Sequence, residues 1–174
     1  MTVRTARYIN SRISSRQVPD LLQAIFTAEL LAPSSCLWIV SPWISDIPVI
    51  DNSANAFICI EPSWNRGPIR FSQILNKLAD VGTTVHVATR PLPHNDIFIR
   101  KLVTTANTDN IQTHLVEELH EKGIVGDSFY LGGSMNFTHN GITINEEAVI
   151  YETTPEVVVE RQVIFRNRWG GEAQ

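Results

Sequence analysis

A histidine and a lysine two residues apart, His120 and Lys122, are the first candidates for chemistry in this sequence. On a β-strand, side chains with this spacing point to the same face, so a titratable imidazole would lie beside a fixed positive charge. An imidazole can transfer a proton or act as a nucleophile near neutral pH, and an ammonium group can bind an anion. The pair therefore indicates a site for an anionic substrate.

Two hydrogen-bonding side chains repeat the same spacing a little further along the chain. Ser134 and Asn136 follow Gly132 and Gly133, where the missing side chains allow backbone and substrate to approach closely. A hydroxyl and an amide can bind phosphate oxygens and stabilise the charge of a transition state, while an imidazole attacks phosphorus. Such a set needs no metal ion, and we expect no cofactor.

These residues belong to an ordered pattern between residues 120 and 147, which reads His-x-Lys-x4-Asp, then Gly-Ser-x-Asn, then Asn-x-Glu. The pattern resembles the signature of the phospholipase D superfamily. Its matching positions are His120, Lys122, Asp127, Gly133, Ser134, Asn136, Asn145 and Glu147. The turn between Asp127 and Gly133 is one residue shorter than is usual in that family.

The resemblance implies that His120 is a nucleophile that forms a phosphohistidine intermediate. It also implies that Lys122 and Asn136 bind the phosphate of the substrate. Family members of this kind act on phosphodiesters without a metal ion, so we expect the same of this chain.

The remaining positions would support these groups. By the same resemblance, Ser134 would help to position the phosphate, and Glu147 would accept a hydrogen bond from the His120 ring and so fix its tautomer. Asp127, Gly133 and Asn145 would serve the structure of the motif rather than its chemistry.

The family active site combines two such motifs around an approximate two-fold axis, with one histidine attacking and the other protonating the leaving group. This chain has only one motif, centred on His120. Similar single-motif proteins form symmetric homodimers, and a two-fold arrangement would place both copies of His120 across one phosphate. The resemblance therefore implies a homodimer with its active site at the interface.

The elements that must position the motif alternate between helical and strand-like patterns. The predicted helices span residues 18–31, 69–79, 96–105 and 155–168. The third is expected to be capped by Asn95 and to bury Ile97, Leu102 and Val103. The predicted strands span residues 36–40, 84–88, 111–117, 121–125, 128–131 and 148–152, with 56–60 as a further candidate. This order is typical of an α/β or α+β sandwich in which helices flank a mixed sheet, and the resemblance implies a phospholipase D-like version of it.

The composition predicts one compact domain over residues 1–174. The chain has 43% hydrophobic and 18% charged residues, which allows a continuous core and excludes a disordered protein. No apolar run approaches a membrane span and no secretion signal is evident, so we expect a cytoplasmic protein. Cys36 and Cys59 lie in apolar runs without neighbouring ligands, which predicts buried, reduced thiols.

The net charge is −4, whereas many nucleic-acid-binding proteins are strongly basic. A polyanion would therefore need a local basic patch to bind to. Arginines gather near both ends of the chain, where either a binding patch or an ordinary solvated face is plausible. They are Arg4, Arg7, Arg12 and Arg16, and Arg161, Arg166 and Arg168.

Three functions remain open. We favour a nuclease that cleaves DNA or RNA, because the sequence has no basic amphipathic helix or anchor for a membrane surface. The alternatives are a phospholipase D-type lipid hydrolase and a non-catalytic nucleic-acid-binding or assembly subunit of a defence or DNA-modification system. Partner proteins of a defence or DNA-modification system are a further hypothesis that rests on the family resemblance alone.

Other residues have a structural and a functional interpretation. His86 and His114 lie inside predicted strands and are expected to be structural. Trp43 follows a strand and either stacks on a base or packs in the rim of the core. His139 and Asn140 follow the Ser134 segment and either border the site or form a polar turn.

Overall fold

A mixed β-sheet forms the centre of the fold, which is known from a computed structural model that describes residues 6–10, 17–143 and 147–170. Its strands are β1 (Ala6–Asn10), β2 (Cys36–Val40), β5 (Thr84–Thr89), β6 (Ile111–Leu115), β7 (Gly123–Val125), β8 (Tyr130–Gly133) and β9 (Ala148–Glu152). They follow the order β1-β9-β8-β7-β2-β5-β6. β5 is parallel to both β2 and β6, and the other neighbours pair antiparallel. The sheet is therefore mixed, as the sequence predicts.

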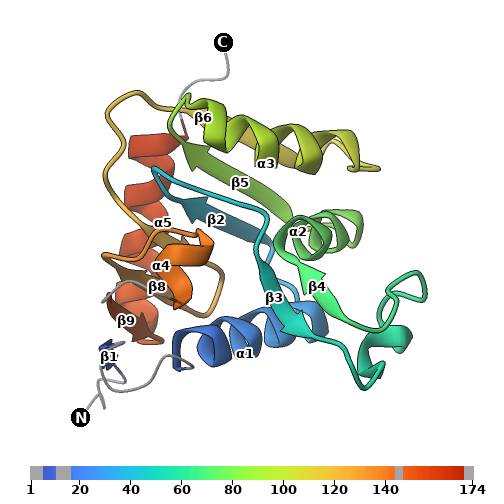
Figure 1. Ribbon diagram of the computed structural model, residues 1–174. Coiled ribbons are helices and arrows are strands. Elements are labelled where there is room, and N and C mark those ends of the chain that lie inside the picture. The colour runs from blue at the N-terminus through green and yellow to red at the C-terminus, as the bar shows by residue number, and fades with distance from the viewer. Residues whose placement is uncertain (1–5, 11–16, 144–146, 171–174) are drawn as a thin grey trace.

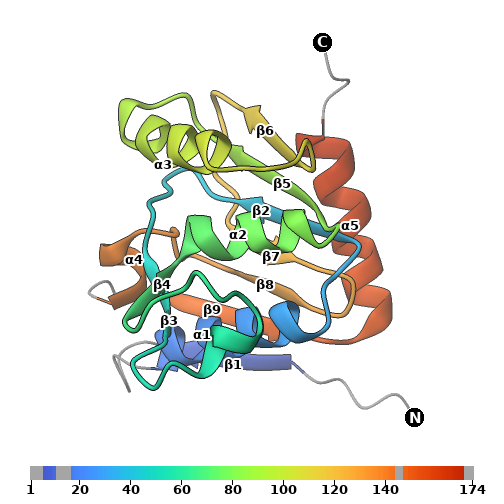
Figure 2. The same ribbon diagram turned by 90° about the vertical axis from the view of Figure 1, so that its right-hand side faces the viewer.

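Helices cover both faces of this sheet (Figures 1 and 2). They are α1 (Gln17–Leu31), α2 (Phe71–Asp80), α3 (Pro93–Thr104), α4 (His139–Thr143) and α5 (Pro155–Trp169). α1, α2 and α3 lie on one face, and α5 lies on the other. The predicted layered α/β architecture is confirmed.

β2 shows how the sequence builds two cores. Its side chains alternate between the faces of the sheet, so a run of five apolar residues can be buried on both sides. Leu37 and Ile39 pack into the core beneath α1, α2 and α3. Trp38 and Val40 pack into the smaller core beneath α5. The strand predicted for residues 36–40 is confirmed.

The segment between β2 and α2 differs from the prediction. It contains a small antiparallel pair, β3 (Pro48–Asp51) and β4 (Pro68–Arg70), and a 3₁₀ turn, η1 (Ala56–Cys59), where a strand was the candidate. The turn is closed locally, because the backbone N–H of Ile60 donates to the carbonyl of Phe57 at 3.0 Å. Cys59 is consequently exposed and Cys36 is only half-buried, so the prediction of two buried thiols is wrong.

α3 begins three residues earlier than predicted, at Pro93, because proline fits the first turn of a helix. Asn95 is therefore inside the helix and is completely buried rather than acting as its cap. The buried apolar side chains are Phe98 and Leu102, and Ile97 and Val103 point to solvent. The helix was predicted correctly, but two of the three residues assigned to its buried face were wrong.

Candidate functional site

The two halves of the motif meet at one edge of the sheet. His120 and Lys122 lie in the loop before β7, which begins at Gly123, so the prediction that they lie on a strand is wrong. Ser134 and Asn136 follow the end of β8. β7 and β8 pair antiparallel with Gly123 opposite Gly132, so the start of one strand lies beside the end of the other. The register therefore brings both segments to the same end of the sheet.

The first segment is accessible to solvent. The His120 side chain is exposed and Lys122 is half-buried. The Lys122 ammonium donates to the backbone carbonyl of His120 at 2.5 Å, which folds this side chain back over the loop. A bound anion could therefore replace the His120 carbonyl as the hydrogen-bond partner of the Lys122 ammonium.

Gly133 fits a conformation that other residues rarely adopt. Its φ is +143°, and a Cβ built on it would lie 2.0 Å from the carbonyl oxygen of Ala148. The next residue is tied to the same partner, because the backbone N–H of Ser134 donates to Ala148 O at 3.0 Å. A glycine is needed here so that the chain can leave β8 while staying in contact with the start of β9.

Ser134 connects this edge to Glu147. Its hydroxyl donates to the Glu147 carboxylate and accepts from the backbone N–H of Ala148 at 3.1 Å. Glu147 is 8% exposed, so its carboxylate lies under the site rather than in solvent. The predicted hydrogen bond between Glu147 and His120 stays a prediction, and Asn145 lies outside the described residues.

Asn136 faces a cavity next to the motif. Its Oδ1 atom is buried and has no hydrogen-bond partner within the described part of the chain, which leaves hydrogen-bonding capacity for a ligand. The cavity has a volume of about 320 Å³. It is lined by Trp43, Ser45, His94, Asn136, Thr138, His139 and Asn140. His139 and Asn140 therefore border the site and also begin α4.

Asp127 lies at the opposite end of β7, in the turn that leads to β8. Its carboxylate accepts from the backbone N–H of Ser35 at 2.6 Å and from the Ser35 hydroxyl at 3.1 Å. The Asp127 N–H donates to the Ser34 hydroxyl at 2.9 Å. This motif residue therefore ties the β7–β8 turn to the start of β2, away from His120.

Asn95 is a positioning residue that the sequence did not reveal. Its amide donates to the carbonyls of Pro42 and Arg90, each at 2.9 Å, and its Oδ1 accepts from the N–H of Ile44 at 3.0 Å. One buried side chain thus joins the segments that follow β2 and β5. In the sequence, Asn95 shows only as a polar residue at the start of an amphipathic pattern, which predicts a cap.

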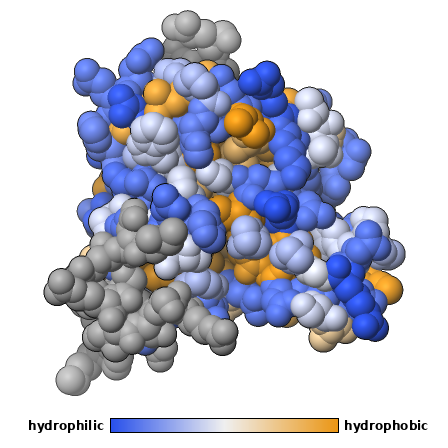
Figure 3. Space-filling view, viewed as in Figure 1, coloured by the Kyte–Doolittle hydropathy of each residue, from blue (hydrophilic) through white to orange (hydrophobic). Residues whose placement is uncertain are grey.

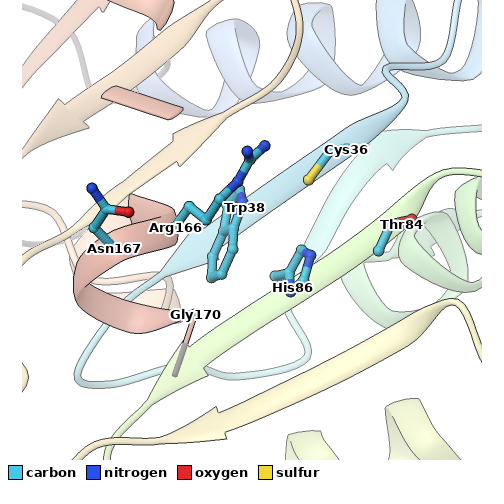
Figure 4. A pocket seen from close by; sticks show the side chains of 7 residues that line it. All are labelled: Cys36, Trp38, Thr84, His86, Arg166, Asn167 and Gly170. Atoms are coloured by element: carbon cyan, nitrogen blue, oxygen red, sulfur yellow. The ribbon is translucent and has the colours of Figure 1, made fainter. Parts of the chain in front are cut away.

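A larger cavity, of about 530 Å³, lies elsewhere and is shown in Figure 4. Its lining residues are Cys36, Trp38, Thr84, His86, Arg166, Asn167 and Gly170. Cys36 and Thr84 are the first residues of β2 and β5, so the cavity reaches the end of these strands that is opposite to His120 and Lys122. Size alone therefore does not locate the chemistry.

The histidines near this cavity form a closed stack. The rings of His86 and Trp38 lie face to face at 4.0 Å, and His86 Nδ1 lies 3.1 Å from His114 Nε2. Burial, reinforced by the charges of His114 and Arg166, lowers the pKa of His86 to about 4. Burial also lowers the pKa of His114. Both rings are neutral near pH 7, which agrees with the structural interpretation of these residues.

The arginines near the C-terminus are partly engaged within the chain. Arg161 lies over the Tyr130 ring at 5.1 Å, and Arg168 forms an ion pair with Glu121 at 3.0 Å. Arg4, Arg12 and Arg16 of the N-terminal stretch lie outside the described residues.

None of the helices in the described ranges has the length and apolar character of a membrane span. Those ranges also hold no cluster of three or more His, Cys, Asp or Glu side chains arranged for a metal ion.

By sequence, the chain matches no protein-family model and no curated protein. Its fold does match solved structures. NucT from Helicobacter pylori is similar with a TM-score of 0.64 at 11% identity, over 94% of this chain and 94% of that chain. A phospholipase D family member, Nuc from Salmonella typhimurium, gives 0.62 at 14% identity, over 96% and 95%. Phosphatidylserine synthase from Haemophilus influenzae Rd KW20 gives 0.55 at 14% identity, over 94% and 36%. The chain therefore has the fold of the phospholipase D superfamily.

Proposed function

We propose that this protein is a metal-independent phosphodiesterase that cleaves nucleic acid through a phosphohistidine on His120. The observation that carries the proposal is the pairing of β7 with β8. It brings the His120–Lys122 loop to the same edge as Ser134 and Asn136. The nucleophile, the cation and the phosphate-binding groups then come from two adjacent segments.

The proposed reaction has two displacements at phosphorus. In the first, a neutral His120 ring nitrogen forms a bond to phosphorus as the bond to the leaving oxygen breaks, and a general acid protonates that oxygen. In the second, water attacks the phosphohistidine, a general base takes its proton, and His120 leaves. Lys122 and Asn136 bind the non-bridging oxygens and stabilise their charge in both transition states.

The general acid is proposed to be His120 of a second copy of this chain. One motif supplies one such imidazole, and the exposed His120 side chain can meet its symmetry mate across a two-fold axis. The likeness to NucT and Nuc extends over 94% and 95% of those chains, so each of them is about as long as this chain. The proposed active unit is therefore the homodimer.

Nucleic acid is favoured as the substrate over lipid. The cavity beside Asn136 contains the exposed indole of Trp43 and several polar side chains, which suits a base better than an acyl chain. The likeness to a phosphatidylserine synthase keeps lipid as the second candidate, although this chain covers only 36% of that protein. The two candidates share the same phosphate chemistry and differ in the group attached to it.

The test compares wild-type protein with His120→Ala on labelled single-stranded DNA, RNA and duplex DNA in EDTA. We expect cleavage by the wild type that resists EDTA and falls with added salt, because nucleic-acid binding is electrostatic. His120→Ala is expected to be inactive. The matched control is His114→Gln, which removes an imidazole that bonds to His86 and does not line the cavity beside Asn136, and this variant should remain active.

Phosphatidylcholine vesicles provide the second arm of the same test. Release of phosphatidic acid without nucleic-acid cleavage would overturn the nuclease and establish the lipid hydrolase. Equal cleavage by the wild type and His120→Ala, or no activity on any substrate, would contradict catalysis by this motif.

A further inference from the structure

Trp43 is the exposed tryptophan of this chain. The sequence has four tryptophans, and Trp38, Trp64 and Trp169 are each less than 8% exposed, whereas Trp43 is 42% exposed. The exposed indole lines the cavity that also contains Asn136, so a ligand held there would cover its ring. Of the two interpretations that the sequence allows for Trp43, the structure favours the binding one.

The backbone around Trp43 is held from several directions. The Ser41 hydroxyl donates to the Trp43 carbonyl at 2.7 Å, and the N–H of Ile44 donates to buried Asn95 at 3.0 Å. The N–H of Ser45 donates to Phe137 O at 2.9 Å, which joins this loop to the segment that carries Asn136. These hydrogen bonds fix the backbone on both sides of Trp43, so a ligand that binds to the indole would need to order little of the loop.

The neighbours of Trp43 give the cavity a mixed character. The His94 ring lies 5.6 Å from the indole at an angle of 62°, and His94 Nε2 lies 2.8 Å from the Ser45 hydroxyl. Thr138 and Asn140 add a hydroxyl and an amide. A flat aromatic surface beside several donors and acceptors matches a nucleobase, which has apolar faces and a polar edge.

Asn136 connects this cavity to the phosphate chemistry, because it belongs to the motif and also lines the cavity. We propose that the cavity binds the nucleobase adjacent to the scissile phosphate, stacked on Trp43, and that the substrate is consequently an unpaired nucleic-acid strand. A base within a duplex already stacks on both neighbours and must leave the helix to reach an indole. The assignment of the phosphate rests on the proposed function, whereas the stacking can be measured without catalysis.

Binding is measured in a His120→Ala background with two oligonucleotides of equal length. One carries bases throughout, and the other carries abasic residues and the same number of phosphates. Adding Trp43→Ala is expected to weaken binding of the first by about tenfold and to leave the second unchanged, because only the first strand has bases that can stack on the indole. Trp43→Phe should keep most of the affinity, and Val163→Ala, which removes an exposed apolar group from α5, should have no effect.

Quenching of tryptophan fluorescence provides a second measurement in protein that retains Trp43. The base-containing strand should quench it, and the abasic strand should not. Equal loss of affinity for both strands, or no loss for either, would overturn the base subsite. The nuclease proposal is tested separately, because a Trp43 effect on binding would stand even if wild-type protein cleaved nothing.

Discussion

Histidines occur in two different environments in this molecule, and the contrast separates chemistry from structure. His86 and His114 bond to each other, and His86 lies stacked on Trp38 in a half-buried layer that lowers the pKa of both rings. His120 is exposed in a loop beside Lys122, at the edge where β7 begins. His86 and His114 bond to each other, and their lowered pKa favours the uncharged rings. His120, in contrast, is exposed where a substrate can reach it.

The comparison also shows why cavity size is a poor guide here. The larger cavity borders the His86 stack, and the smaller one borders Asn136 and Trp43. Only the smaller cavity shares a residue with the motif. The motif and the exposure of its residues, rather than volume, identify the site.

The largest expected effect separates the two kinds of histidine directly. His120→Ala should lower the rate of phosphodiester cleavage by at least about 10³-fold, since loss of a covalent nucleophile removes the whole pathway. His114→Gln should stay within about threefold of the wild type, because its ring lies outside the site. Steady-state cleavage rates of the two variants in parallel provide the measurement, and similar losses in both would erase the distinction.

Gly133→Ala tests the close contact between the end of β8 and the start of β9, next to Ser134. The added Cβ would lie 2.0 Å from Ala148 O at a φ of +143°, so we expect a loss of about 3 kcal/mol in the free energy of unfolding. Urea denaturation gives the value. Gly82→Ala is a matched control, because that glycine also has a positive φ but open space around its Cβ. An equal cost at both sites would show that the contact with Ala148 is unimportant.

Asp127→Ala tests the motif residue that lies away from the chemistry. The variant loses two hydrogen bonds to Ser35 in an exposed turn, so stability should fall by about 1 kcal/mol. Cleavage measured well below the melting temperature should remain close to the wild type. A loss of activity comparable to that of His120→Ala, in a protein that stays folded, would assign Asp127 to the catalytic machinery.

The smallest expected effect is the change of folding stability with pH that comes from the half-buried pair His86 and His114. The folded pKa of His86 is about 4, below its ordinary value of 6.5, so the unfolded chain binds protons that the folded chain does not. The resulting contribution to stability is present above about pH 6.5 and is lost as the pH falls toward 4. With solvent screening of a half-buried group, the change should be on the order of 1 kcal/mol.

Urea midpoints near pH 7.5 and pH 5 give this contribution. The double variant His86→Gln, His114→Gln should show a weaker pH dependence than the wild type, while its cleavage activity at pH 7.5 is retained. An unchanged pH dependence would mean that other groups control stability in this range.

Local sequence patterns were sufficient to predict the order of most helices and strands. The burial of Leu37, Trp38, Ile39 and Val40 on the two faces of the sheet is visible as one apolar run, and Gly132 and Gly133 mark the end of β8. The motif residues were found in the same way, because their spacing is short. The two-residue spacing predicts a strand for His120 and Lys122, whereas both lie in the loop before β7, a position that the pattern could not give.

The features that were missed depend on contacts between distant parts of the chain. Asn95 reaches Pro42, Ile44 and Arg90, and no local pattern indicates these partners. Strand β1 was not predicted, and it is defined by its pairing with β9, far along the sequence. A stack such as Trp38 on His86 likewise needs the parallel register of β2 and β5. These contacts follow from tertiary structure.

The proposed mechanism requires a covalent bond between His120 and the substrate phosphate, and trapping this bond is the most direct test. Wild-type protein would be mixed with a labelled oligonucleotide in EDTA, quenched rapidly under alkaline conditions and examined by intact mass and peptide mapping. We expect an acid-labile oligonucleotide adduct on the peptide that contains His120, and no adduct in His120→Ala. Cleavage without any adduct, or an adduct on another residue, would contradict it.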